Sequence, residues 1–219
     1  MNVEKVTIVV PTDFTKVADT AVEHAIGLCK SIPNSEVVLL HIIGKEKEKA
    51  SAEVKMKEQS EKLTKSSGIK VGYEARLGNI FDDIGAAATD LKAKLIIMGT
   101  HGVKGMQHIT GSYAVKVITH SSVPFIVVQE RGFRDGYKNL ILPFDLTKDS
   151  KQKLSLAINI AKVFNSKVHI IYPQETDTFL VNAINNNVSL AKNELRNNQI
   201  EFDVKMTDEK GNFVKQFLS

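Results

Sequence analysis

The chain is poor in residues that crosslink a protein or anchor it in a membrane. Its single cysteine, Cys29, cannot form an internal disulfide, which fits a reducing compartment. No apolar run approaches the ~20 residues that a membrane-spanning helix needs, and Met1 to Lys5 lack a signal-peptide layout. We therefore expect a cytoplasmic protein that does not enter a membrane.

An excess of one charge is also missing. The formal net charge is only +4, and acidic and basic residues are interspersed, which indicates solubility with a slight preference for anionic ligands. The densest charged run, Lys45 to Lys65, alternates lysine with glutamate and is typical of a solvated helix face. A nucleic-acid surface would need clustered basic residues, so we expect no nucleic-acid partner.

Several common chemical motifs do not occur. No Gly-x-Gly-x-x-Gly follows the first apolar run and no Gly-x-x-x-x-Gly-Lys-Ser/Thr is present, which argues against a typical dinucleotide fold and a P-loop. No spacing of His, Cys, Asp or Glu indicates a metal site, and no Ser/His/Asp arrangement is readable. We therefore expect no metal site and no catalytic residues, so that binding outranks catalysis.

Five short apolar runs alternate with helix-length segments in the first part of the chain. They are typical of strands buried on both faces and cover Val6–Val10, Val37–Ile43, Val71–Leu77, Leu95–Met98 and Val123–Gln129. Apolar residues at helical spacing predict the helices between them, including one that starts at Gly78-Asn79. This alternation predicts parallel βαβ units with right-handed crossovers, and so a doubly wound α/β sheet.

The most informative segment follows the fourth apolar run. Gly99 to Ser112 reads GTHGVKGMQHITGS and precedes a helical pattern. A glycine-rich loop between a strand and a helix can bring backbone N–H groups close to phosphate, and the helix dipole favours the negative charge. Ser112 can cap that helix or donate its hydroxyl to a phosphate oxygen. The alternative is a tight turn in which the glycines only supply positive φ.

At this point the chain resembles the universal stress protein family. The resemblance rests on motifs in the family's order: Val10–Asp13 (VPTD), Leu40–Ile42 (LHI), Met98–Gly102 (MGTHG), Gly111–Ser112 (GS) and Ser122–Val128 (SVPFIVV). It implies a five-stranded sheet of order 3-2-1-4-5, of the adenine nucleotide alpha hydrolase-like type. The first and fourth strands are then neighbours, and a ligand would bind beyond their carboxyl ends.

The resemblance also implies an adenine-nucleotide site. ATP-binding members carry Gly-x2-Gly-x9-Gly-Ser/Thr, and this chain matches at Gly99, Gly102, Gly111 and Ser112 with only eight residues between the second and third glycines. The implied site residues are Pro11, Thr12, Asp13, Ile42, Met98, Gly99, His101, Gly102, Gly111 and Ser112. ATP or another adenine nucleotide is the expected cofactor, and Mg²⁺ is expected only with nucleotide.

Some of these residues also have a purely structural interpretation. Asp13 would accept a hydrogen bond from a ribose hydroxyl or the adenine amine, or it caps a helix beginning at Thr15. Ile42 would offer its backbone to adenine, or it only packs in the core. His101 would contact phosphate, or it orients the loop. His41 is expected at a strand end beside the site.

A second segment of the chain resembles the first. Lys138–Lys148 repeats the pattern of Lys5–Lys16, which indicates an internal repeat of about domain length. The predicted organisation is a complete domain over 1–130, a linker over 131–137 and an incomplete second copy over 138–219. The second copy lacks the fourth and fifth strands and the glycine loop. Either the chain has been shortened or another surface covers the exposed edge.

These observations predict a stress-response module that binds adenine nucleotide and acts through binding and dimerisation. The fifth strand, Val123 to Val128, is too apolar for a free sheet edge and is the expected homodimer contact. The alternatives are a dimeric scaffold without nucleotide and a weak ATPase or autokinase. A response-regulator receiver is excluded because the third strand ends Arg76-Leu77-Gly78 and not in a phosphoacceptor aspartate.

Overall fold

The computed structural model describes residues 4–100, 117–118, 121–134, 136–143 and 150–207 of the 219-residue chain. The chain divides into two compact units, Met1–Arg134 and Asp135–Ser219. Within the described ranges, no helix is long and apolar enough to cross a membrane.

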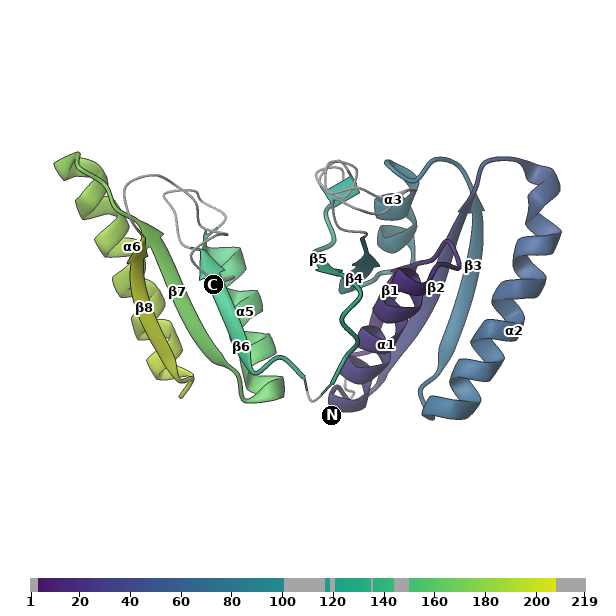
Figure 1. Cartoon of the computed structure of the whole chain (residues 1–219), viewed down its shortest axis with the longest axis horizontal. Helices are drawn as coiled ribbons and strands as arrows, with labels where there is room; N and C mark the ends of the chain where they lie inside the picture. Colours follow the sequence, from purple (N-terminus) through teal and green to yellow (C-terminus); the bar gives the residue numbers. More distant parts are fainter. Residues whose placement is uncertain (1–3, 101–116, 119–120, 135, 144–149, 208–219) are drawn as a thin grey trace. The chain divides into compact units, whose positions relative to one another are not determined.

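The first unit is built on a five-stranded sheet (Figure 1). Its strands are β1 (Val6–Pro11), β2 (Ser35–Ile43), β3 (Val71–Leu77), β4 (Leu95–Gly99) and β5 (Phe125–Val128). They stand in the order β3-β2-β1-β4-β5, and every neighbouring pair is parallel. The predicted doubly wound sheet and its strand order are confirmed.

Helices cover both faces of this sheet because the chain winds outward from β1 in two directions. α1 (Lys16–Ser31), the 3-10 turn η1 (Glu46–Glu48) and α2 (Lys49–Ser67) lead from β1 to β3, whereas α3 (Asp83–Asp90) leads back towards β4. Right-handed crossovers in opposite directions put α3 on the opposite face from α1 and α2. The buried cluster on the α3 face contains Val9, Val38, Leu40, Ile84, Ala87, Ala88, Ile96, Met98, Val117 and Val123.

The third helix begins later than the sequence pattern predicted. α3 starts at Asp83 and not at Gly78-Asn79. The side-chain oxygen of Asn79 accepts hydrogen bonds from the backbone N–H groups of Phe81 (2.9 Å) and Asp82 (3.1 Å). An asparagine oxygen that accepts from the N–H groups two and three residues further on has the geometry of a helix N-cap. The Asn79 carbonyl also accepts from the Asp83 N–H at 3.1 Å, so Asn79 caps a turn over residues 80–82 that leads into α3.

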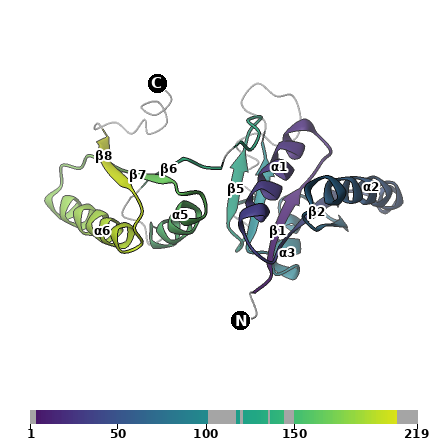
Figure 2. The ribbon, with the colours of Figure 1, turned by 90° about the horizontal axis from the view of Figure 1, so that it is seen from below.

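The second unit has a smaller sheet. It contains β6 (Asn139–Pro143), α5 (Ser150–Phe164), β7 (Lys167–Pro173), α6 (Thr178–Asn197) and β8 (Phe202–Thr207). The three strands are parallel in the order β6-β7-β8, with α5 and α6 on the same side of them (Figure 2). Leu142, Leu154, Ile170 and Leu195 belong to a core cluster of this unit's own residues. The arrangement fits a partial repeat of the first sheet.

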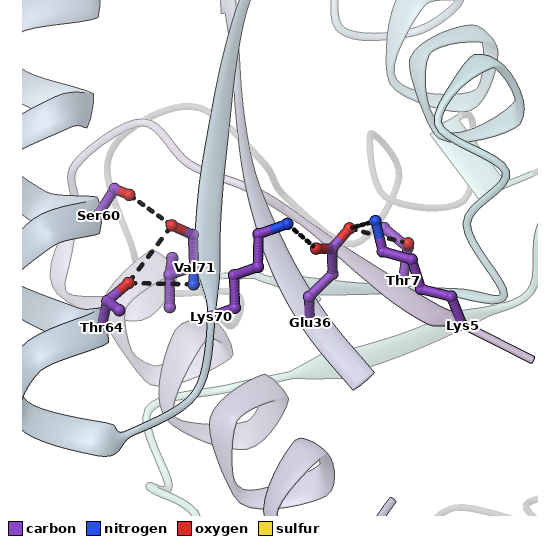
Figure 3. A network of polar contacts seen from close by, with 7 residues as sticks. All are labelled: Lys5, Thr7, Glu36, Ser60, Thr64, Lys70 and Val71. Atoms are coloured by element: carbon purple, nitrogen blue, oxygen red, sulfur yellow. Dashed lines mark hydrogen bonds and ion pairs between the residues drawn. The ribbon is translucent and has the colours of Figure 1, made fainter. Parts of the chain in front are cut away.

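Side chains of α2 close part of the outer edge of β3 (Figure 3). Ser60 Oγ donates to the Val71 carbonyl at 2.6 Å, and Thr64 Oγ1 accepts from the Val71 N–H at 3.1 Å. An outer strand otherwise leaves such backbone groups unpaired and open to another strand. At Val71, therefore, the chain itself occupies the edge.

A buried carboxylate lies near the start of β2, between two lysines (Figure 3). Glu36 is only 8% exposed, and its oxygens lie 2.6 Å from Lys5 Nζ and 2.9 Å from Lys70 Nζ. Thr7 Oγ1 donates to it at 3.3 Å. Burial raises the pKa of the Glu36 carboxyl, but the two lysines outweigh burial and hold that pKa below its usual range.

The second sheet has an ion pair at the position that corresponds to Glu36, with a lysine in place of the glutamate. Thr7 pairs with Glu36 in the first sheet, and Asn139 pairs with Lys167 at the equivalent place in the second. Lys167 Nζ lies 3.0 Å from the Glu201 carboxylate, as the Glu36 carboxylate lies close to a lysine of the first unit. Each unit thus has an oppositely charged pair at this position of its sheet, although the individual residues differ.

We expect Glu36→Gln to lower stability at neutral pH by about 1.5–3 kcal/mol, because glutamine keeps the shape but loses the charge-assisted hydrogen bonds. The pKa of Glu36 is lower in the folded chain than its ordinary value of 4.5. Its contribution is therefore present above the unfolded pKa and is lost as pH falls through the folded pKa. Urea unfolding should show the full difference from wild type at pH 7 and a smaller one near pH 3.

Glu61→Gln is the matched control, because the side chain of Glu61 is 68% exposed in an i,i+4 contact. Surface pairs of this kind contribute about 0–1 kcal/mol. A Glu36→Gln difference that persists undiminished at low pH would contradict the role given to the two lysines.

Candidate functional site

A cavity of about 70 Å³ lies at the carboxyl ends of β1, β2 and β4. The strand order reverses here, and doubly wound sheets bind ligands at such places. Six of the predicted site residues line the cavity: Pro11, Thr12, Asp13, Ile42, Met98 and Gly99. The other four, His101, Gly102, Gly111 and Ser112, lie outside the described residues.

The cavity lining also includes residues that the sequence did not single out. They are Val17 and Ala18 of α1, Leu40 of β2, and Ile80 and Ile84 from the β3–α3 region; His41, expected beside the site, joins them. The first turn of the helix after β1 is a signal that could have found Val17 and Ala18. No local motif marks Ile80 and Ile84, which reach the cavity through the packing of α3.

Thr12 shapes the exit of the chain from β1. Its N–H donates to the Leu40 carbonyl at 2.8 Å, and its own carbonyl lies 2.7 Å from His41 Nδ1. Its hydroxyl oxygen accepts from the Phe14 N–H at 3.1 Å. Thr12 is buried, so each of its polar groups is held within the protein.

Asp13 supports the start of α1 without being its cap. The N-cap is Thr15, whose Oγ1 accepts from the Ala18 N–H at 3.4 Å. Asp13 Oδ1 accepts from both the backbone N–H (3.1 Å) and the hydroxyl (2.5 Å) of Thr15. Asp13 is exposed, and its other oxygen has no hydrogen bond to any residue that the structure describes. Among the described residues, one carboxylate oxygen of Asp13 therefore has no hydrogen-bond partner.

Ile42 combines a packed side chain with a backbone that, among the described residues, has no strand partner on the β1 side. Its side chain packs against the core cluster of the α3 face. Its backbone, however, lies beyond the last residue pair between β1 and β2, which is Pro11 with Leu40. The Leu40 carbonyl points towards β1, where it accepts from Thr12, and backbone groups alternate sides along a strand. The N–H and C=O of Ile42 thus point to the same side, beyond the end of β1.

Gly99 has a packing role at the end of β4. A Cβ atom on Gly99 would lie 2.3 Å from the Val17 carbonyl oxygen, closer than any side chain tolerates. The lack of a side chain lets β4 end against the first turn of α1. Gly99 is not among the glycines with positive φ, so the tight-turn explanation does not apply to it. Met98, just before it, is fully buried.

A sheet of order β3-β2-β1-β4-β5 with a cavity at its switch point places the first unit in the class of doubly wound α/β domains. The sequence profile of the universal stress protein family matches residues 6–129, more than half of the chain. The chain belongs to this family.

Individual relatives agree with this assignment. One universal stress protein of Methanocaldococcus jannaschii is 29% identical over 161 residues, covering 60% of this chain and 99% of the relative. A second from the same organism is 32% identical over 145 residues, covering 56% of this chain and 81% of the relative.

A solved universal stress protein from Archaeoglobus fulgidus DSM 4304 has a TM-score of 0.75 at 19% identity, covering 93% of this chain and 79% of that one. At this identity the likeness is one of fold, and its coverage extends into the second unit.

We expect Gly99→Ala to destabilise the first unit by about 1–3 kcal/mol, because the new methyl group overpacks the Val17 carbonyl. Thermal and urea unfolding measure the change. Gly44→Ala is the control, since nothing lies within 4 Å of a Cβ at Gly44 and its φ is not positive. Equal stability of the two variants would contradict the close approach of β4 and α1.

Proposed function

We propose that this chain is a stress-response module that binds an adenine nucleotide, with ATP as the first candidate, at the cavity beyond β1 and β4. One observation carries the proposal: Ile42 and Asp13 line the same cavity. Among the described residues, the Ile42 backbone has no strand partner on the β1 side, and one Asp13 oxygen has no hydrogen bond. A neighbouring N–H and C=O can pair with a ring nitrogen and the amine of adenine, and a carboxylate oxygen accepts from ribose hydroxyls.

The described cavity accounts for only part of such a ligand. Its volume of about 70 Å³ is far below the ~300–1,000 Å³ of typical small-molecule sites. We therefore assign the base and ribose to the described residues, and the phosphates to His101, Gly102, Gly111 and Ser112 on the family pattern. Mg²⁺ would come with the phosphates, because it is usually bound through substrate phosphates and water.

Native mass spectrometry of the purified full chain should detect a bound adenine nucleotide, and calorimetry should measure its affinity. We expect Asp13→Asn to weaken ATP binding about tenfold, or ~1.4 kcal/mol. Asparagine can keep an oxygen for Thr15 but replaces the other oxygen with an NH₂ group, which cannot accept from a hydroxyl.

Asp177→Asn is the matched control. Asp177 is the N-cap of α6 in the second unit, where its carboxylate accepts from the N–H groups of Phe179 and Leu180. Asparagine caps helices about as well, so ATP affinity should not change. Equal ATP affinity in wild type and Asp13→Asn would argue against the assigned site.

A dimeric scaffold without nucleotide is the second candidate function. The spacing between Gly102 and Gly111, one residue shorter than in ATP-binding members, favours it, as does the small cavity. Absence of bound nucleotide and of any heat on ATP addition would select this candidate. An ATPase or autokinase is less supported, because Asp13 is the one carboxylate among the described residues of the cavity and phosphoryl transfer needs metal ligands and a positioned nucleophile.

We also propose that two chains associate through β5 and its flanking residues, Val123 to Val128. β5 is an outer strand of the sheet. The carbonyl of Pro124 accepts from the N–H of Ile96 in β4, and that of Val128 accepts from the N–H of Thr100 just after β4. By alternation, the backbone groups of Phe125 and Val127 therefore point outward. Val127 is also 42% exposed. The opposite edge, at β3, is less available because α2 side chains occupy it in part.

We expect Val127→Pro to weaken the homodimer at least tenfold while leaving the monomer folded. Proline removes an N–H that points away from β4, and edge strands tolerate such a change. Val127→Thr keeps the N–H and should still dimerise. Sedimentation velocity over a concentration series measures both. A monomeric wild type, or a Val127→Pro dimer of unchanged strength, would contradict this interface.

A further inference from the structure

We propose that His41 is a positioning residue of this site: it fixes the Thr12 carbonyl and the Phe14 ring, and thereby aims the free oxygen of Asp13 at a hydroxyl of the ligand. The inference rests on the nucleotide-binding function proposed above. It makes His41 a determinant of selectivity for ligands that carry ribose hydroxyls.

The first step is the hydrogen bond between β2 and the exit of β1. His41 Nδ1 lies 2.7 Å from the Thr12 carbonyl oxygen. Since a carbonyl oxygen can only accept, Nδ1 carries the proton and donates. The Thr12 N–H is held by Leu40, also from β2. Both backbone groups of the residue before Asp13 are thus fixed by one strand.

The second step is the residue after Asp13. Phe14 has a φ of 62°, a left-handed conformation that is rare for a bulky side chain. Such a backbone persists where its surroundings hold it firmly. The Phe14 ring stands 4.8 Å from the His41 ring, centroid to centroid, and Lys55 Nζ lies 5.8 Å from the centroid of the Phe14 ring. The ring is therefore held from β2 and from α2.

The third step follows from these two anchors. Asp13 lies between Thr12 and Phe14, and its Oδ1 is engaged twice by Thr15. With both neighbours fixed and one oxygen bound, the direction of the other oxygen is set. If His41 is removed, the Thr12 carbonyl loses its donor and Phe14 its ring contact, so the turn can relax to negative φ. His41 acts in this way through Thr12 and Phe14.

The test compares ATP with 2′,3′-dideoxy-ATP in wild type, His41→Leu and His41→Asn. We expect wild type to prefer ATP about tenfold, the value of one lost hydrogen bond of ~1.4 kcal/mol. His41→Leu should bind both nucleotides almost equally, through a loss of ATP affinity alone. His41→Asn should keep most of the preference, because its NH₂ group can replace Nδ1–H. Unchanged preference in His41→Leu, or an equal loss for both nucleotides, would overturn the inference.

A second measurement needs no nucleotide. Hydrogen exchange followed by NMR should show faster exchange of the Phe14 and Thr15 amides in His41→Leu and recovery in His41→Asn. The Gly78 amide, bonded to Ile43 on the other side of β2, should not change. Unchanged Phe14 and Thr15 exchange would overturn the positioning role even if nucleotide binds. Faster exchange in a chain that binds neither nucleotide would instead refute the proposed function and the ligand part of this inference.

Discussion

The position at which β1 ends determines the geometry of the whole candidate site. β1 lies between β2 and β4, and the connections from this centre leave in opposite directions, so no crossover helix needs to cover its carboxyl end. Because the chain turns away after Thr12, the backbone of Ile42 has no strand partner on the β1 side among the described residues. The same turn presents Asp13 and brings the first turn of α1 against Gly99. The cavity, the unpaired Ile42 backbone and the Asp13 oxygen without a described partner all result from the position at which β1 ends.

Some of the predicted site residues therefore have a structural role in addition to the proposed binding role. Thr12 uses its hydroxyl and both backbone groups within the protein, and Gly99 is required by the Val17 carbonyl whether or not a phosphate is near. Loss of binding in a variant of either residue would not by itself identify a ligand contact. Asp13 and Ile42 are more informative. Both line the cavity, and one oxygen of Asp13 and the backbone groups of Ile42 have no hydrogen-bond partner among the described residues.

The second unit shows that register can persist while side-chain chemistry changes. Ile141 and His169 pair in the second sheet as Val9 and Val38 do in the first. Val9 is 0% exposed and Ile141 is 50% exposed, and the His169 ring bonds the Asp203 carboxylate at 2.9 Å. The described helices of this unit pack on the other face, which removes the need for an apolar residue at the place of Val38. Within its described residues β6 has one neighbour, so a switch point like that of β1 is not formed there.

The strands of the first unit could be predicted from the sequence, because a buried parallel strand must be a short run of apolar residues and such runs are visible locally. The sequence also predicted a site at Asp13, Ile42 and Gly99, with the strand order supplied by the family resemblance. Three features could be found only in the folded chain: the close approach that requires a glycine at position 99, the contribution of α1 and the β3–α3 region to the cavity wall, and the Asp13 oxygen that has no described partner. The hydrogen bonds of Asn79, which cap the turn that leads into α3, likewise appear only in the structure. Periodicity records which face of an element is apolar, whereas the atoms that meet at a site depend on crossovers and packing between residues distant in the chain.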